Sequence, residues 1–404
     1  MPRLIIMAVF FWAALGSCGI LPAQTPAGAP DRILVFAPQL EHYSEKNDYA
    51  RLFAEDLLKH WPQEKVTLRH FPEPGLKDPT LISRLLADLA DDASLKAVVI
   101  GEAPAGCLDG LARLKARRPD LYLLVIDPHE GLEKMARVAT LSLSLDHIAR
   151  GYLYPVLARR MGARSLVLYS FPRHMELEEL GRMQRVMTQA CRDLGLILVS
   201  DLQGPDPGLP EADLADLEAY LEKTMGRYLE QYGPDTAFVA TSTVHSDILV
   251  PAIMRQGGRS LPAVQSSLIL GFPEALDLGD EARLLFGQWR RLLAVEDEKI
   301  MALNPPGQFA SWVYPYPHTA MLAMVDMAVR AGEEKIDLCD PEALNDVLAK
   351  YSPGVKWSVR SKLDYHQDQP VPRALLLSQD SYWFGQGFQG FTRLNIPAKY
   401  YRLQ

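Results

Sequence analysis

Short apolar runs alternate with longer amphipathic stretches from Asp31 to about residue 126. The apolar runs are rich in β-branched and aromatic residues and predict strands, while the longer stretches carry apolar residues at helical spacing. The expected strands are 33–36, 66–70, 97–101 and 121–126, and the expected helices are 47–60, 78–89 and 105–117. The last two strands are apolar throughout, which is typical of strands buried on both faces of a parallel sheet. The pattern predicts βαβ units and a doubly wound α/β sheet.

The same alternation begins again after a long helix expected at 145–161. The second set of strands is expected at 165–169, 196–199, 236–240 and 263–266, and its helices at 176–194, 211–232 and 246–256. Two consecutive sets predict two Rossmann-like lobes with parallel sheets and a cleft between them. Type I periplasmic binding proteins have this architecture.

The remainder of the chain has a weaker pattern. Residues 284–301 and 319–331 are expected to be helical, and 374–377 and 382–384 are expected to be strands. Because the chain of a type I binding protein crosses its hinge more than once, we expect these segments to complete both lobes. The predicted domains are 31–148 plus about 281–318 for the first lobe and 149–280 plus about 319–404 for the second.

The N-terminal segment has the pattern of an export signal. Arg3 precedes an apolar run that ends at Leu15-Gly-Ser-Cys18, and this run is too short to span a bilayer. The tetrapeptide resembles a bacterial lipobox, which implies a signal peptide at 1–18, lipidation of Cys18 and a tether at 19–30. The chain would then be anchored by lipid alone, facing the periplasm or the cell exterior. The alternative is plain secretion with cleavage near Ala23.

Composition and charge narrow the function. The 404 residues are 48% hydrophobic and 23% charged, which is typical of a globular protein. A net charge of −8 provides no field to hold a polyanion, so nucleic-acid binding is not expected. Three cysteines after Cys18, namely Cys107, Cys191 and Cys339, have no disulfide-framework or metal-site spacing, although one pairing among them stays open.

Familiar catalytic motifs are missing from the sequence. It has no Gly-x-Ser-x-Gly elbow, no P-loop and no His-Glu-x-x-His, and its nine histidines are scattered without an i, i+4 pair. We therefore expect no metal, no cofactor and no catalytic residue. A binding function is favoured over an enzymatic one.

The clearest candidate site follows the strand expected at 165–169, since ligands of open α/β sheets meet the carboxyl ends of strands. Here Arg173 could clamp a carboxylate or phosphate, His174 and Ser170 could hydrogen-bond, and Phe171 could stack on a ring. The alternative is a turn shaped by Pro172, with Arg173 paired to a nearby surface glutamate.

Other strand ends supply weaker candidates. Thr241 and Ser242 could contact ligand or cap the next helix, and Ser266 ends another expected strand. In the first lobe Gln39, Glu102 and Asp127 occupy the corresponding positions, with ordinary loop structure as the alternative.

An aromatic stretch that contains two prolines could line the cleft. It contains Trp312, Tyr314, Tyr316 and His318, and sugars or bases commonly stack on such rings. Packing between the lobes explains these rings equally well.

Part of the second set resembles a bacterial lipoprotein family known as domain of unknown function 3798, which is similar in fold to type I periplasmic binding proteins and distantly to nucleoside-binding basic membrane lipoproteins. The likeness covers about 160–280 and rests on Met161-Gly-Ala163, Ser170-Phe-Pro-Arg-His-Met175, Cys191, Leu194-Gly195, Pro205-Asp-Pro207, Tyr232-Gly233, Asp235-Thr-Ala-Phe238, Pro251 and Gly271-Phe-Pro-Glu-Ala-Leu276. This resemblance implies an exported two-lobed binding fold, and it identifies no catalytic residue in this chain. The Ser266-Ser-Leu268 turn and the helix from Ala212 to Met225 depart from the family pattern.

The sequence therefore favours a lipid-anchored extracytoplasmic solute-binding protein. It would capture a small polar ligand, such as a nucleoside, a sugar or a small anion, and present it to an ABC permease or a membrane sensor. Two alternatives stay open: an exported α/β enzyme, which would need Glu102 or Asp127 close to His174, and an interaction lipoprotein with a vestigial cleft.

Overall fold

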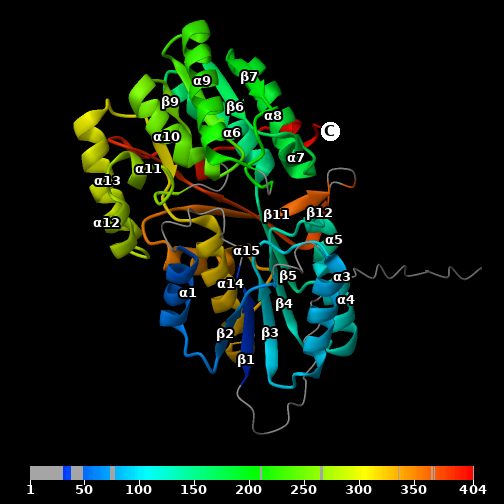
Figure 1. The fold of residues 1–404 in the computed structure, drawn as a ribbon. Helices are drawn as coiled ribbons and strands as arrows, with labels where there is room; N and C mark the ends of the chain where they lie inside the picture. The colour runs from blue at the N-terminus through cyan, green and yellow to red at the C-terminus, as the bar shows by residue number, and fades with distance from the viewer. Residues whose placement is uncertain are drawn as a thin grey trace, which may run out of the picture.

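A computed structural model describes residues 31–37, 49–72, 78–209, 212–263, 267–334, 336–364, 367 and 369–403. Figure 1 shows two α/β layers, one above the other, with long strands between them. The predicted signal peptide and tether lie outside the described residues. Within the described part of the chain, no helix combines the length and apolar character needed to cross a membrane.

The first lobe is built on a seven-stranded sheet. In spatial order the strands are β11 (Trp357–Asp364), β12 (Gln369–Gln379), β5 (Leu141–Leu145), β4 (Tyr122–Ile126), β3 (Leu95–Ile100), β1 (Arg32–Phe36) and β2 (Val66–Arg69). Strands β11 and β12 are antiparallel, and all other neighbours are parallel.

Successive residues of these strands point to opposite faces, and both faces are buried. In β1, Ile33 and Val35 share a core with α1 (Tyr49–His60) and α14 (Tyr316–Glu333), whereas Leu34 and Phe36 share another with α3 (Pro79–Asp88) and α4 (Cys107–Arg117). Figure 1 places these helix pairs on opposite sides of the sheet. The doubly wound sheet predicted from the fully apolar runs is confirmed.

The second lobe contains a smaller parallel sheet that continues into a short antiparallel one. Its four strands are β7 (Ile197–Asp201), β6 (Ser165–Tyr169), β8 (Thr236–Ala240) and β9 (Arg259–Ser260). A parallel bridge between Ser260 and Phe309 leads from β9 to the next strands. These are β10 (Ala310–Trp312), β13 (Ser381–Trp383) and β14 (Gly387–Phe388).

Helices of the second lobe pack in pairs. Helix α6 (His147–Arg160) lies along α8 (Glu178–Leu194), and α9 (Leu214–Tyr232) contacts α10 (Val244–Gln256). Gly151 allows the first pair to approach closely, because a Cβ atom there would lie 2.6 Å from the Met183 carbonyl oxygen. The remaining helices of the molecule include two that pack on the first lobe, α5 (Leu132–Ala136) and α15 (Pro341–Tyr351). The others are α7 (Pro172–Met175), α11 (Phe272–Ala275), α12 (Gly279–Leu284), α13 (Trp289–Leu303) and α16 (Ala398–Tyr401).

The chain passes between the lobes three times within the described residues. The passages follow β5, β10 and β12, and two of them are joined where the Gln379 side chain donates to the Tyr314 carbonyl (2.9 Å) and accepts from the Tyr314 N–H (3.0 Å). The carboxyl ends of β5 and β10 lie at these passages. Both parallel sheets therefore turn their carboxyl edges toward the hinge.

The course of the last 120 residues differs from our expectation. We expected about 281–318 to return to the first lobe and 319–404 to complete the second. Instead, β10 continues the second-lobe layer, whereas α14 packs on β1, β3 and β4, and β12 pairs with β5. The strand at 374–377 belongs to the first sheet because it pairs in parallel with β5, from Ala374 opposite Ser142 to Leu377 opposite Leu145. The domain limits themselves remain a proposal.

Candidate functional site

Glu102 and Asp127 stand side by side at the carboxyl edge of the first sheet, directly after β3 and β4. A backbone hydrogen bond from the Ala103 N–H to the Ile126 carbonyl (3.2 Å) joins the two loops. Both acidic residues have left-handed backbone conformations, with φ of 47° and 44°. Such conformations are costly for residues other than glycine, and they are concentrated at functional sites.

The two carboxyl groups differ in their partners. One Asp127 oxygen accepts from Ser144 Oγ (2.7 Å) and the Leu145 N–H (3.3 Å), while its other oxygen, Oδ2, is buried and has no hydrogen bond of normal geometry to any described residue. Glu102 forms no hydrogen bond or ion pair with any described residue. Burial and the neighbouring Asp127 charge raise the pKa of Glu102 to about 8, and burial raises the pKa of Asp127 to about 6.

The buried side chains of Tyr316 and Arg150 lie near these acids. Tyr316 is 2% exposed and lies within electrostatic reach of Asp127, Glu102 and Arg150. Arg150 is also 2% exposed, with its guanidinium carbon 4.6 Å from the centroid of the Trp312 ring. The Tyr316 hydroxyl acts as a donor toward Asp127 and Arg150 toward Tyr154, but the Tyr316 hydroxyl and Nε and Nη1 of Arg150 have no hydrogen bond of normal geometry to any described residue. Buried polar atoms normally have partners, so these side chains can receive a bound molecule or water.

The second-lobe edge presents a hydroxyl and imidazole network. Ser170, after β6, and Thr241, after β8, are hydrogen-bonded through their hydroxyls at 2.8 Å. The Nδ1 atom of His174 lies 3.0 Å from the same Thr241 oxygen, and its ring centroid is 4.0 Å from that of Phe171. Four of the predicted residues are therefore brought together. Ser242 is buried beside Thr241 and forms no side-chain cap of α10.

His245 is a further member of this edge that the sequence did not single out. It is 1% exposed, its ring packs edge-on against Phe171 at 5.9 Å, and its Nδ1 atom has no partner among the described residues. Burial lowers the pKa of His245 to about 4, so the ring is neutral at pH 7. Its position in the first turn of a helix after a strand end was the signal available in the sequence.

Arg173 is already paired. Its Nε and Nη2 atoms donate to the two carboxylate oxygens of Asp206 at 2.7 and 2.8 Å. Asp206 is well buried and also accepts from the Gly208 N–H (2.9 Å), and the Arg173 hydrogen bonds hold the pKa of its carboxyl below the usual range. The partner is neither Glu176 nor Glu178, the nearby glutamates. An anion would have to compete with Asp206 for this guanidinium.

Interactions link the two lobes near these edges. The Arg173 charge is among the causes that lower the pKa of His129, which follows β4 in the first lobe. The Tyr49 hydroxyl of α1 donates to the Ile269 carbonyl of the second lobe at 3.3 Å.

An exported enzyme would need Glu102 or Asp127 close to His174. Neither Glu102 nor Asp127 forms a hydrogen bond or ion pair with His174. No group of three or more His, Cys, Asp or Glu in this part of the chain could hold a metal ion.

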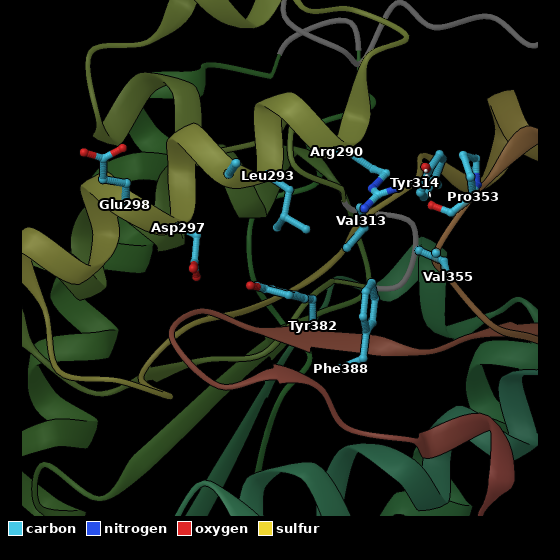
Figure 2. Close-up of a pocket in the computed structure, with 12 residues that line it drawn as sticks. Arg290, Leu293, Asp297, Glu298, Val313, Tyr314, Pro353, Val355, Tyr382 and Phe388 are labelled. Atoms are coloured by element: carbon cyan, nitrogen blue, oxygen red, sulfur yellow. Dashed lines mark hydrogen bonds between the residues drawn. The ribbon is translucent and has the colours of Figure 1, made fainter.

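A pocket of about 410 Å³ lies at the hinge and has different walls from the strand edges (Figure 2). It is lined by α13, by the segment after β10, by residues 353–355 and by the strands β13 and β14. At one end of the pocket the Tyr314 hydroxyl donates to the Pro353 carbonyl at 3.0 Å (Figure 2). The sequence did not predict it, because its walls come from four distant segments.

The predicted aromatic stretch serves packing more than an exposed cleft. Trp312 donates its indole N–H to the Ala263 carbonyl (2.9 Å), and His318 Nε2 lies 3.0 Å from the Asp56 carboxylate. Trp312, Tyr314, Tyr316 and His318 are all buried. Only Tyr316 lies beside the candidate acids.

Three predicted residues, Gln39, Ser266 and Cys18, lie outside the described residues. Cys107, Cys191 and Cys339 are described, and no disulfide joins them. The first two are buried, and burial raises their thiol pKa values, as expected of core residues.

Comparison with protein families identifies the chain. The family model "Protein of unknown function (DUF3798)" matches residues 41–310, about two thirds of the sequence. The chain belongs to this family. A second family model, which carries no descriptive name, matches 321–403. The DUF3798 match extends beyond the 160–280 region in which the sequence resemblance was specific.

Two uncharacterized proteins of Treponema pallidum (strain Nichols) are similar to this DUF3798 chain. One is 37% identical over 175 residues, which cover 43% of this chain and 80% of the relative. The other is 40% identical over 126 residues, which cover 31% of this chain and 56% of the relative.

Solved structures of other proteins are similar to this chain. A Clostridium difficile 630 protein named as a transcriptional regulator has a TM-score of 0.68 at 15% identity, covering 88% of this chain and 99% of its own. An ABC transporter solute-binding protein of Burkholderia graminis C4D1M, solved with D-arabinose, has a TM-score of 0.48 at 13% identity and covers 76% and 91%. The architecture described above and the first likeness confirm the predicted α/β fold of the type I periplasmic-binding-protein kind.

Proposed function

We propose that this chain is an exported solute-binding protein that captures a small polar ligand between its lobes. The observation that carries the proposal is the pair of facing strand edges. One presents Glu102 and Asp127 with strained backbones, and the other presents the Ser170, Thr241 and His174 network. Ligands of open α/β sheets meet such edges, where loops converge. Affinity would come from hydrogen bonds and water exclusion, with the hinge supplying closure.

The cellular setting is part of the proposal. The lipobox-like Leu15-Gly-Ser-Cys18 and the apolar run before it support export and a lipid anchor at Cys18. An anchored binding protein would present its ligand to an ABC permease or to a membrane sensor. Nothing in the proposed site requires a cofactor.

A thermal-shift screen of the mature chain against nucleosides, sugars, amino acids and other small polar metabolites tests the proposal. A ligand recovered unchanged after it stabilises the protein supports a binding function. Chemical turnover of a hit supports an exported enzyme instead. No stabilisation by any compound favours an interaction lipoprotein and contradicts the proposal.

A further inference from the structure

The Glu102 carboxyl group lacks a counter-charge. Its only charged neighbour among the described residues is Asp127, which is also acidic. Asp127 is itself partly compensated, because the buried Arg150 guanidinium acts on it electrostatically and Ser144 donates to it. The pair therefore has one uncompensated acidic group at the edge of the first sheet.

Further evidence that a molecule binds here comes from two buried polar atoms, the Tyr316 hydroxyl and Asp127 Oδ2. The hydroxyl acts as a donor toward Asp127, but the two groups are not in normal hydrogen-bond geometry, and neither atom has another partner among the described residues. Unpartnered buried polar atoms cost free energy unless a bound molecule or water satisfies them. A ligand group that enters from the facing lobe would have both acceptors and a hydroxyl available.

The second lobe brings a buried positive charge to the acids through Arg150 of α6, which acts on Asp127 but is not among the charges that act on Glu102. The other basic side chains of the candidate site are already engaged or neutral. Arg173 donates both of its well-formed hydrogen bonds to Asp206, and His245 stays neutral at pH 7 because burial lowers its pKa to about 4. Nδ1 of His174 is held at Thr241. In its ionised form Glu102 therefore has no counter-charge among these residues, and a cationic group of the ligand would supply one.

We propose that the ligand of the interlobe site carries a positively charged amino group, bound by the Glu102 and Asp127 carboxylates together. This inference rests on the proposed function and names the ligand class. It differs from the anionic ligand that Arg173 alone suggests, because Asp206 has already neutralised that arginine.

Proton release accompanies this binding. In the empty protein the Glu102 carboxyl keeps its proton at pH 7, since its pKa is about 8. When an ammonium group binds, the ionised form is favoured, the Glu102 O–H bond breaks and the proton passes to the buffer. Affinity for the amine should therefore rise as the pH increases from about 6 to about 8, up to the pKa of the amine itself.

Calorimetry with matched probes tests the proposal on the mature chain. Glucosamine is compared with glucose, and putrescine with 1,4-butanediol, each in two buffers of different ionisation enthalpy. We expect an amine to bind at least about tenfold more tightly than its neutral counterpart, because hydrogen bonds to charged groups are the stronger ones. The buffer dependence of the heat should show release of up to one proton.

Variants assign the effect to the acids. Glu102→Gln should abolish the amine preference and the proton release, and Asp127→Asn should reduce the preference. Glu298→Gln, an equivalent change of an exposed acid at the hinge pocket, should leave both unchanged. Unchanged thermal unfolding shows that each variant is folded.

Several outcomes overturn the inference and separate it from the proposed function. Equal affinity for the neutral probes, or an amine preference that survives in Glu102→Gln, contradicts the amino-group assignment but leaves the solute-binding proposal intact. The same holds if neither amine binds while another screened solute does. If no solute stabilises the chain, the proposed function fails with the inference.

Discussion

Glu102 and Asp127 show what a sequence can and cannot reveal about a residue. Their positions after apolar strands predicted that they lie at the sheet edge. Their left-handed conformations and mutual repulsion depend on how neighbouring loops fix the backbone, which no local pattern encodes. Arg173 illustrates the same limit, because its partner Asp206 is 33 residues away and only the fold brings them together.

Glycine at position 102 should stabilise the protein and impair binding. Glu102 has a φ of 47°, and glycine adopts this conformation without the strain that a side chain causes. We expect Glu102→Gly to raise the free energy of unfolding by about 1 kcal/mol in urea titrations. Arg373, with a φ of 63°, is an exposed control outside the site. Arg373→Gly should give a similar gain with unchanged ligand affinity, and a loss of stability in both variants would contradict the strain argument.

Stability should depend on pH through the two acids. Their pKa values are raised, to about 8 for Glu102 and about 6 for Asp127, so between about pH 5 and pH 8 the folded state binds more protons than the unfolded state. The free energy of unfolding should therefore fall as pH rises across this range. Chemical unfolding of the wild type and of Glu102→Gln at several pH values checks this. An equally steep fall in the variant would show that Glu102 is not the group responsible.

At the scale of elements, strong apolar runs were predicted well and mixed ones were missed. Asp78 and Pro79 open α3 as expected, with the Asp78 carboxylate accepting from the Thr80 N–H at 2.9 Å. Strand β5 was not predicted, although Leu and Ser alternate through 141–145 with the two-residue period of a strand and all five residues are buried. Strand β11 is mostly half-buried and polar at a sheet edge, so its sequence carries little apolar signal.

The close packing of α6 on α8 makes a prediction about Gly151. An added Cβ atom would lie 2.6 Å from the Met183 carbonyl oxygen and 2.9 Å from Val186 Cβ, so the helices must move apart. We expect Gly151→Ala to destabilise the protein by about 1–3 kcal/mol, measured by urea unfolding.

Gly332 near the end of α14 provides the matched control. Nothing lies within 4 Å of its Cβ position, so Gly332→Ala should be neutral or stabilise the protein by up to about 1 kcal/mol. If both variants lose the same stability, close helix packing is not the cause.

At the scale of the molecule, the sequence predicted two lobes but misassigned the segments that complete them. Which edge a late strand joins depends on the free edges left by earlier strands. Here β5 accepted β12, and the β9 and β10 layer accepted β13. The hinge pocket could not be predicted from the sequence, because its walls come from segments that lie far apart in the chain (Figure 2).

Attachment to the membrane is also a property of the whole molecule, and substitution of Cys18 tests it. If Cys18 is lipidated, Cys18→Ser should move the exported chain from the membrane fraction to the soluble fraction and abolish labelling with radioactive palmitate. Ser17→Ala, a neighbouring small substitution, should leave both unchanged. Membrane association that persists in Cys18→Ser would contradict the lipid anchor.

Hydrogen exchange with and without a saturating ligand tests the central claim most directly, because it reports both lobes in one experiment. The account predicts slower exchange on both strand edges together, in the loops around 101–106 and 127–131 of the first lobe and 170–176 and 241–246 of the second. Protection confined to one lobe, or to the hinge pocket around 290–298, would contradict capture between the two edges.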